Sequence, residues 1–164
     1  MVSGLIEYEG ALYYALAGER QIRWASLTDE NGNEVYYYFD PATGKAVDGV
    51  QQINEGTIFT YTFENHILVK GDLRYHPCRC VGTSNEIEEH VGVSGLGYRW
   101  AGRWLMGQWI EVDGNKYYLQ KYHNIVDTGF LYKSSTNQDV PGNGYYLFDE
   151  TGVFQENFTG LYGD

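Results

Sequence analysis

The chain has 164 residues, a formal net charge of −11, and 16 tyrosines and 21 glycines against only 3 prolines. The acidic balance argues against nucleic acids and anionic membranes as partners, because both require a basic surface. No apolar run is long enough for a transmembrane helix and no signal peptide is visible, so no membrane insertion is expected. Met1 is followed directly by a repeat, from which we expect the parent protein to be longer.

The high content of Tyr and Gly predicts short strands and tight turns rather than helices. A five-residue pattern recurs along the chain, with Tyr at its second position and a large apolar residue at its fourth. The second positions are Tyr14, Tyr37, Tyr61, Tyr117 and Tyr146, and the fourth are Leu16, Phe39, Phe63, Leu119 and Phe148. Side chains two residues apart on a strand share a face, so these positions are predicted to form a core column. The first and third positions are predicted to face solvent or a ligand.

Each copy of the pattern follows a short strand and a turn sequence. The turns fall at residues 9–10, 31–33, 55–56, 113–115 and 142–144. Asn-Gly and Asp-Gly between alternating segments are strong hairpin signals, because the tight turn needs positive φ. A lone hairpin is marginally stable in water, whereas stacked hairpins bury their columns against one another. The predicted fold is therefore all-β, a solenoid of stacked β-hairpin repeats with one insertion.

The repeats divide the chain into three segments. Residues 1–71 contain hairpin repeats one to three, and residues 107–164 contain repeats four and five and a C-terminal cap. Residues 72–106 are the insertion, which is either a sixth unit that has decayed past recognition or a loop subdomain. Within it, residues 85–90 could form a short helical turn.

The insertion contains residue types that zinc accepts, namely His76, Cys78, Cys80 and His90. The two cysteines are separated by one residue, whereas paired Cys ligands usually lie two to four residues apart. A disulfide closing so small a ring would be strained. No metal and no cofactor are therefore expected, and the cysteines do not assign a redox compartment.

No catalytic constellation is apparent. Glu86, Glu88 and Glu89 cluster on a polar turn, but a glycosidase needs two carboxylates fixed across a cleft. No Ser lies in a nucleophile-elbow context. We therefore expect that the chain is not an enzyme.

The repeated pattern resembles the cell-wall-binding repeats of Gram-positive surface proteins. The clearest copies are residues 31–44, 113–118 and 145–152, and the similarity covers everything but the insertion. That family includes choline-binding modules, glucan-binding repeats and the C-terminal repeats of clostridial toxins. The resemblance implies a secreted, cell-wall-associated module that anchors a larger protein without catalysis. Its implied partners are cell-wall polymers, glycans or choline, and residues 158–163 look like the end of such an array.

The resemblance also implies where a ligand would bind. In choline-binding members, a Trp after the opening Gly and an aromatic residue at the start of the Tyr strand help to cage a quaternary ammonium by cation–π attraction. Aromatic faces can equally stack on sugar rings. The ligand-binding residues that this implies are Trp24, Tyr36, Tyr38, Trp109, Phe130 and Tyr145. Trp24 is paired with Tyr36 and Phe130 with Tyr145, while Trp109 is displaced by one residue from the family pattern.

Other units have lost the opening Trp, as at Leu5, Val50 and Gln108, which favours a glycan or no small ligand. One alternative function is thus a structural or protein-interaction array, such as an adhesin or a homodimerisation module. Trp100, Trp104 and Trp109 form either a sugar-stacking platform or packing contacts between the insertion and the solenoid.

Overall fold

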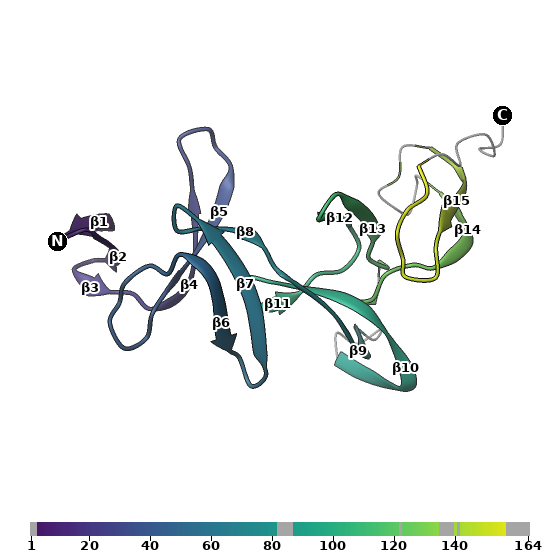
Figure 1. The fold of residues 1–164 in the computed structure, drawn as a ribbon, viewed down its shortest axis with the longest axis horizontal. Helices are drawn as coiled ribbons and strands as arrows, with labels where there is room; N and C mark the ends of the chain where they lie inside the picture. The colour runs from purple at the N-terminus through teal and green to yellow at the C-terminus, as the bar shows by residue number, and fades with distance from the viewer. Residues whose placement is uncertain (1–2, 82–86, 122, 135–139, 141, 157–164) are drawn as a thin grey trace. The chain divides into compact units, whose positions relative to one another are not determined.

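The computed structural model is all-β, with small antiparallel sheets and no helix among the residues it describes. The structure describes residues 3–81, 87–121, 123–134, 140 and 142–156, except the side chains of residues 78–81 and 87–93. Figure 1 shows the strands as a series of separate hairpins. Two compact units are formed, unit 1 by Met1–Asp72 with Trp100–Gly102, and unit 2 by Leu73–Arg99 with Arg103–Asp164. None of the described segments is a helix that could span a membrane.

Unit 1 contains three successive hairpins, the first and third of which carry a short third strand. The sheets are β1-β2-β3, β4-β5 and β6-β7-β8. The strands are β1 (Gly4–Tyr8), β2 (Ala11–Leu16), β3 (Glu19–Arg20), β4 (Arg23–Thr28), β5 (Glu34–Phe39), β6 (Gly49–Asn54), β7 (Ile58–Glu64) and β8 (Ile67–Lys70). Glu9 and Gly10 both have positive φ, 48° and 78°, as a two-residue type I′ turn requires.

Unit 2 contains the last two repeat hairpins and most of the insertion. Its sheets are β11-β10-β9, β12-β13 and β14-β15. The strands are β9 (Asp72–Val81), β10 (Ile87–Trp100), β11 (Arg103–Trp104), β12 (Trp109–Val112), β13 (Asn115–Tyr118), β14 (Gly129–Lys133) and β15 (Gly144–Phe148). Asp113 and Gly114 join β12 to β13 with φ of 51° and 82°, so the predicted hairpin turn is confirmed.

The insertion is a β-hairpin with a short third strand, the same form as the first and third repeats. The short helical turn predicted over residues 85–90 is wrong from Ile87 onward, because β10 begins there. The physical reason is that the backbone of this segment pairs with β9 across the hairpin, and local helical preference is weak against a complete ladder.

The predicted core column is confirmed in four of the five repeats. Its second and fourth positions are buried there: Tyr37, Phe39, Tyr61, Phe63, Tyr117, Leu119, Tyr146 and Phe148. The first repeat differs, since Leu16 is 46% exposed and Tyr14 is half-buried against the ring of Phe39 at 5.8 Å. Leu16 pairs with Glu19 of β3, a strand of two exposed residues. This short strand covers little of the apolar surface of Leu16.

The opposite face is less open than predicted. Tyr38 and Tyr118, at the third position of the pattern, are buried with 9% and 1% exposure. The expectation that this face meets solvent or ligand is therefore wrong at these two tyrosines. A middle hairpin of a stack has neighbours on both faces, and a tryptophan stands opposite each of these rings on the partner strand.

Candidate functional site

Trp24 lies at the junction of two hairpins in unit 1. It stands on β4 directly opposite Tyr38 of β5, and the two rings meet edge to face with centroids 5.1 Å apart. On its other side, the indole meets Tyr61 of β7 edge to face at 4.8 Å and stacks on Phe63 at 5.8 Å. The indole remains partly exposed, whereas the other three rings are buried. Such edge-to-face and offset pairs are the favoured arrangements of aromatic rings.

A carboxylate lies at the edge of this group of rings. Glu55, in the turn between β6 and β7, accepts a hydrogen bond from Trp24 Nε1 at 3.3 Å on Oε2. Its Oε1 accepts a second from the Tyr61 hydroxyl at 2.5 Å. Together, Trp24, Tyr38, Tyr61, Phe63 and Glu55 are called the Trp24 cluster below. The cluster combines apolar ring faces with one negative charge.

The electrostatic setting of Tyr38 reflects the same packing. Burial raises the pKa of the Tyr38 phenol above its ordinary value, and the nearby carboxylates of Glu55 and Asp40 raise it further. The Arg23 guanidinium opposes this shift but does not overcome it. Tyr38 is therefore a neutral phenol at physiological pH.

Tyr36 is not the partner of Trp24. Ser26 is the residue opposite Tyr36 in the ladder, while Trp24 is opposite Tyr38. The Tyr36 ring instead meets Trp100 edge to face at 6.2 Å, and its hydroxyl donates to Glu34 Oε1 at 2.6 Å. The predicted pairing of Trp24 with Tyr36 is therefore corrected to a pairing with Tyr38. The residue directly opposite the indole in the ladder is itself aromatic, and the Tyr36 ring packs on Trp100 instead.

Trp109 repeats the geometry of Trp24 in unit 2. It stands opposite Tyr118, with ring centroids 5.2 Å apart and planes inclined at 71°, close to the 5.1 Å and 68° of Trp24 with Tyr38. It stacks on Phe148 of the next hairpin at 5.9 Å and meets Phe154 at 5.2 Å. In the sequence, Trp109 is displaced by one residue relative to the opening Gly of its repeat. This displacement does not change its place in the hairpin, because Trp109 and Trp24 both stand opposite the third-position tyrosine.

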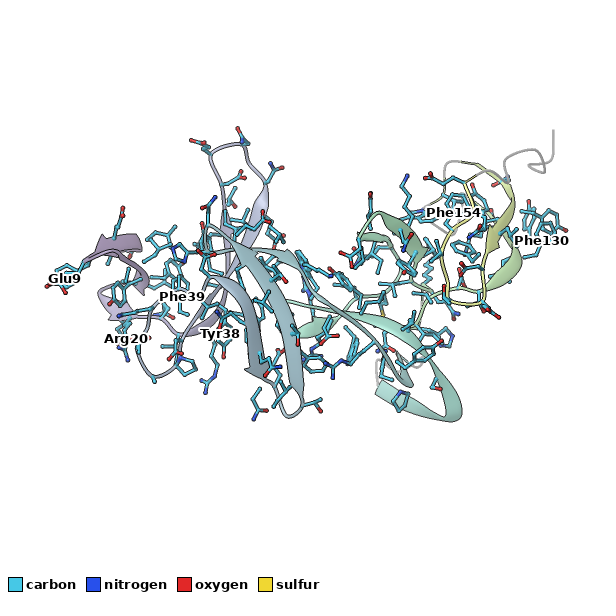
Figure 2. The ribbon with its side chains drawn as sticks, viewed as in Figure 1. Glu9, Arg20, Tyr38, Phe39, Phe130 and Phe154 are labelled. Atoms are coloured by element: carbon cyan, nitrogen blue, oxygen red, sulfur yellow. The ribbon has the colours of Figure 1, made fainter. Side chains whose placement is uncertain are left out.

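Phe130 and Tyr145 lie together on one face of the last hairpin, as the sequence pairing suggested. Their rings are parallel within 6°, with centroids 4.8 Å apart, and they are 48% and 42% exposed. Tyr132, 59% exposed, meets Tyr145 edge to face at 5.4 Å. Figure 2 shows Phe130 on the outer side of the β14–β15 hairpin and Phe154 on the side that faces the β12–β13 hairpin. Because the two parallel rings touch, a ligand can use only the outer surface of the pair.

The three tryptophans at the end of the insertion and just after it all contact other rings. Trp100 packs on Tyr36 and Trp109 on Tyr118, while Trp104 stacks on His76 at 3.8 Å. The Trp100 contact joins the insertion to the second repeat, as the packing alternative predicted. The Trp104 contact lies within the insertion and the Trp109 contact within the fourth repeat.

Among the described residues, no group of three or more His, Cys, Asp or Glu side chains is placed to hold a metal ion. His76 Nε2 lies 3.0 Å from the backbone oxygen of Asn124. The side chains of Cys78, Cys80 and His90 lie outside the described part, as do residues 135–139 of the last long loop and residues 157–164 of the predicted cap.

Sequence reasoning missed Glu55 and the junction role of Tyr61. The sequence predicted Glu55 only as part of a turn and Tyr61 only as part of the core column. Their contact with Trp24 joins different hairpins, and a repeat pattern gives the face of a residue without giving its neighbour on the next hairpin. Tyr38 was among the predicted ligand-binding residues, but the sequence did not indicate that its ring packs on Trp24.

No family model matches the chain, and no curated protein matches it. Solved structures do. CbpJ from Streptococcus pneumoniae is 19% identical over 94% of this chain and 52% of its own, with a TM-score of 0.34. Choline binding protein F from the same species, in the presence of a peptidoglycan analogue, is 17% identical over 99% of this chain and 58% of its own, with a TM-score of 0.34.

A third similar structure is alternansucrase in complex with isomaltotriose, which is 21% identical over 95% of this chain and 9% of its own, with a TM-score of 0.30. The chain spans only a little over half of each choline-binding structure and a small part of alternansucrase.

Proposed function

We propose that the chain is a non-catalytic binding module that attaches a larger secreted protein to cell-wall or cell-surface polymers. The observation that carries the proposal is the Trp24 cluster, in which a partly exposed indole lies among buried aromatic rings beside a carboxylate. Indole and phenol faces attract quaternary ammonium groups and also stack on the apolar faces of sugars. The ligand class is the one that the repeat motifs imply, a glycan or a choline-bearing polymer.

The charge of the cluster is compatible with both ligands. Glu55 places a negative charge at the edge of the indole, which favours a cation and also offers an acceptor to sugar hydroxyls. Arg23, which lies close enough to lower the pKa of Tyr38, opposes a cation. The chemistry therefore distinguishes cell-surface ligands from nucleic acids, whose phosphates the net charge of −11 repels.

The test is a thermal-shift titration of the purified chain with choline, a panel of glucans and cell-wall fragments, followed by retention on isolated Gram-positive walls. A ligand that binds only the folded state raises the unfolding temperature. Trp24→Phe is expected to weaken that response, because a smaller ring lowers cation–π and stacking energy and the Nε1 donor is lost. Tyr8→Phe, at a tyrosine that is 61% exposed, is the control and should leave the response intact.

If the unaltered chain neither shifts with these ligands nor binds walls, the proposal is wrong. An equal loss in both phenylalanine variants would also contradict it, since the loss would then follow from general destabilisation of the hairpins.

A second candidate function, a protein-interaction array, is favoured by the outer face of the last hairpin. Phe130 stands opposite Leu147 as Trp109 stands opposite Tyr118, so this face is built like one that another hairpin covers. Exposed aromatic residues gathered on one face often mark an interaction surface. Light scattering across a concentration series tests it, with Phe130→Ser plus Tyr132→Ser expected to abolish any dimer. Val50→Ser, at an isolated exposed position that is 68% accessible, is the control.

A further inference from the structure

Lys133 and Asp127 form an ion pair inside unit 2. The Lys133 ammonium donates to Asp127 Oδ2, and the two residues are only 2% and 6% exposed. Lysine is rarely buried to this extent, because removing an ammonium from water is costly unless other groups replace its hydration. The surroundings of this ammonium therefore need an explanation beyond the single carboxylate.

Aromatic rings supply that explanation. Lys133 Nζ lies 4.1 Å from the centroid of the Tyr118 ring and 5.7 Å from that of Phe148. Both distances fall within the range of cation–π attraction, which is stronger when the cation is desolvated. Trp109 packs against both of these rings, at 5.2 and 5.9 Å. The ammonium thus lies in the same kind of aromatic environment that a quaternary ammonium ligand would require.

The matching place in unit 1 is built from apolar residues. The backbone N–H of Asp127 donates to the oxygen of Tyr118 at 2.9 Å, as that of Val47 does to the oxygen of Tyr38. Lys133 lies two residues after the partner of Tyr146, as Ile53 lies two residues after the partner of Tyr61.

The places of Val47 and Ile53 are thus taken by Asp127 and Lys133. A junction of this geometry forms with apolar residues at these two places, and buried ion pairs are often no more stabilising than apolar residues of similar size. The charged pair is therefore not a requirement of the fold.

We propose that Tyr118 and Phe148 form a cation site which the chain fills with its own Lys133 ammonium, with Asp127 as the counterion. The site is closed to external ligands while Lys133 is in place, and it accepts a small alkylammonium ion when that side chain is shortened. One consequence rests on the proposed function: of the two tryptophan-containing junctions, the Trp24 cluster is open to ligand and the Trp109 junction is occupied.

Lys133→Ala tests the site, because n-propylammonium replaces the three methylenes and the ammonium that the substitution removes. The variant should unfold at a lower temperature than the unaltered chain. Saturation with n-propylammonium chloride to ten times its dissociation constant should raise that temperature by about 5 °C. Sodium chloride at equal ionic strength and neutral 1-propanol should not do so.

Two matched variants isolate the charge. Ile53→Ala opens a cavity at the equivalent apolar place and should show no preference for propylammonium over propanol. Asp127→Val with Lys133→Ile copies the unit 1 residues and should fold without any propylammonium response. An equal response of Lys133→Ala, Ile53→Ala and the unaltered chain would overturn the proposal.

A measurement on the unaltered chain covers the case in which Lys133→Ala does not fold. The methylene protons next to the Lys133 ammonium should resonate upfield of ordinary lysine in NMR spectra, through the ring current of Tyr118. Ordinary chemical shifts would refute the site. Failure here leaves choline or glycan binding at Trp24 untouched, and failure of that binding leaves the Lys133 site intact, so the two proposals are separable.

Discussion

Trp24 Nε1 lies 3.3 Å from Glu55 Oε2, so one hydrogen bond to a charged group joins the second hairpin to the third. The same carboxylate is bonded by Tyr61 of the third hairpin. Stacked hairpins are held mainly by apolar burial, which is not directional. Glu55 adds direction, because it fixes the indole relative to the neighbouring hairpin.

Glu55→Gln should therefore lower the free energy of unfolding by about 1.5 kcal/mol, because hydrogen bonds to a neutral amide are weaker than those to a carboxylate. Urea unfolding followed by tryptophan fluorescence measures the loss. Glu9→Gln, in the exposed first turn, is the control and should change little. Equal stabilities of the two variants would show that the Glu55 contacts are not energetically significant.

Tyr38→Ala tests the unexpected burial of the third position. Tyr38 is 9% exposed and its ring packs against Trp24, so truncation should cost about 3 kcal/mol by lost burial and cavity formation. Tyr8→Ala, at a tyrosine that is 61% exposed, should stay within about 0.5 kcal/mol of the unaltered chain. Chemical denaturation of both variants gives the comparison, and similar losses would contradict the packing described for Tyr38.

Gly114 and Gly142 differ in backbone conformation, although a methyl group added at either position would meet only open space. Gly114 has φ of +82°, so Gly114→Ala should destabilise the β12–β13 hairpin by about 1 kcal/mol through left-handed strain. Gly142 lies outside that region, and Gly142→Ala should be neutral or slightly stabilising. Melting curves of the pair decide the point; a neutral Gly114→Ala would mean that the turn relaxes.

Asp149 should make stability depend on acid pH. Burial acts to raise the pKa of its carboxyl, but hydrogen bonds from the Thr151 hydroxyl and from the N–H groups of Thr151, Gly152 and Val153 outweigh it and lower the pKa below 3.8. A lowered folded-state pKa gives stability that is fully present above the unfolded-state pKa and is lost as pH falls through the folded-state value.

Asp149→Asn should therefore destabilise the chain at neutral pH and flatten its stability profile in acid. Carboxyl ¹³C NMR should find the pKa below its ordinary value, and Thr151→Ala should raise it. Glu150→Gln, exposed beside it, is the control and should leave the acid profile unchanged. An Asp149 pKa at or above 3.8 would contradict the hydrogen-bonded turn.

The sequence by itself determined the hairpins and their inner face. Turn residues such as Asp113 and Gly114 require positive φ, and the period of two along each strand places Tyr61 and Phe63 on one side, so both follow from local rules. The strands of the insertion could not be predicted in the same way. The residues after Ile87 pair with β9 on the other side of a hairpin, and that pairing leaves no local pattern in the sequence.

Only the tertiary structure decided what meets across the junctions between hairpins. Trp24 packs on Tyr38, the ring directly opposite it, rather than on Tyr36, and Glu55 reaches it from the next hairpin. Lys133 carried no sequence signal at all, yet its ammonium lies over the Tyr118 ring. A repeat pattern fixes the face on which each side chain lies, whereas contacts between repeats depend on how far and at what angle one hairpin packs on the next, and that is set by the side chains of both together.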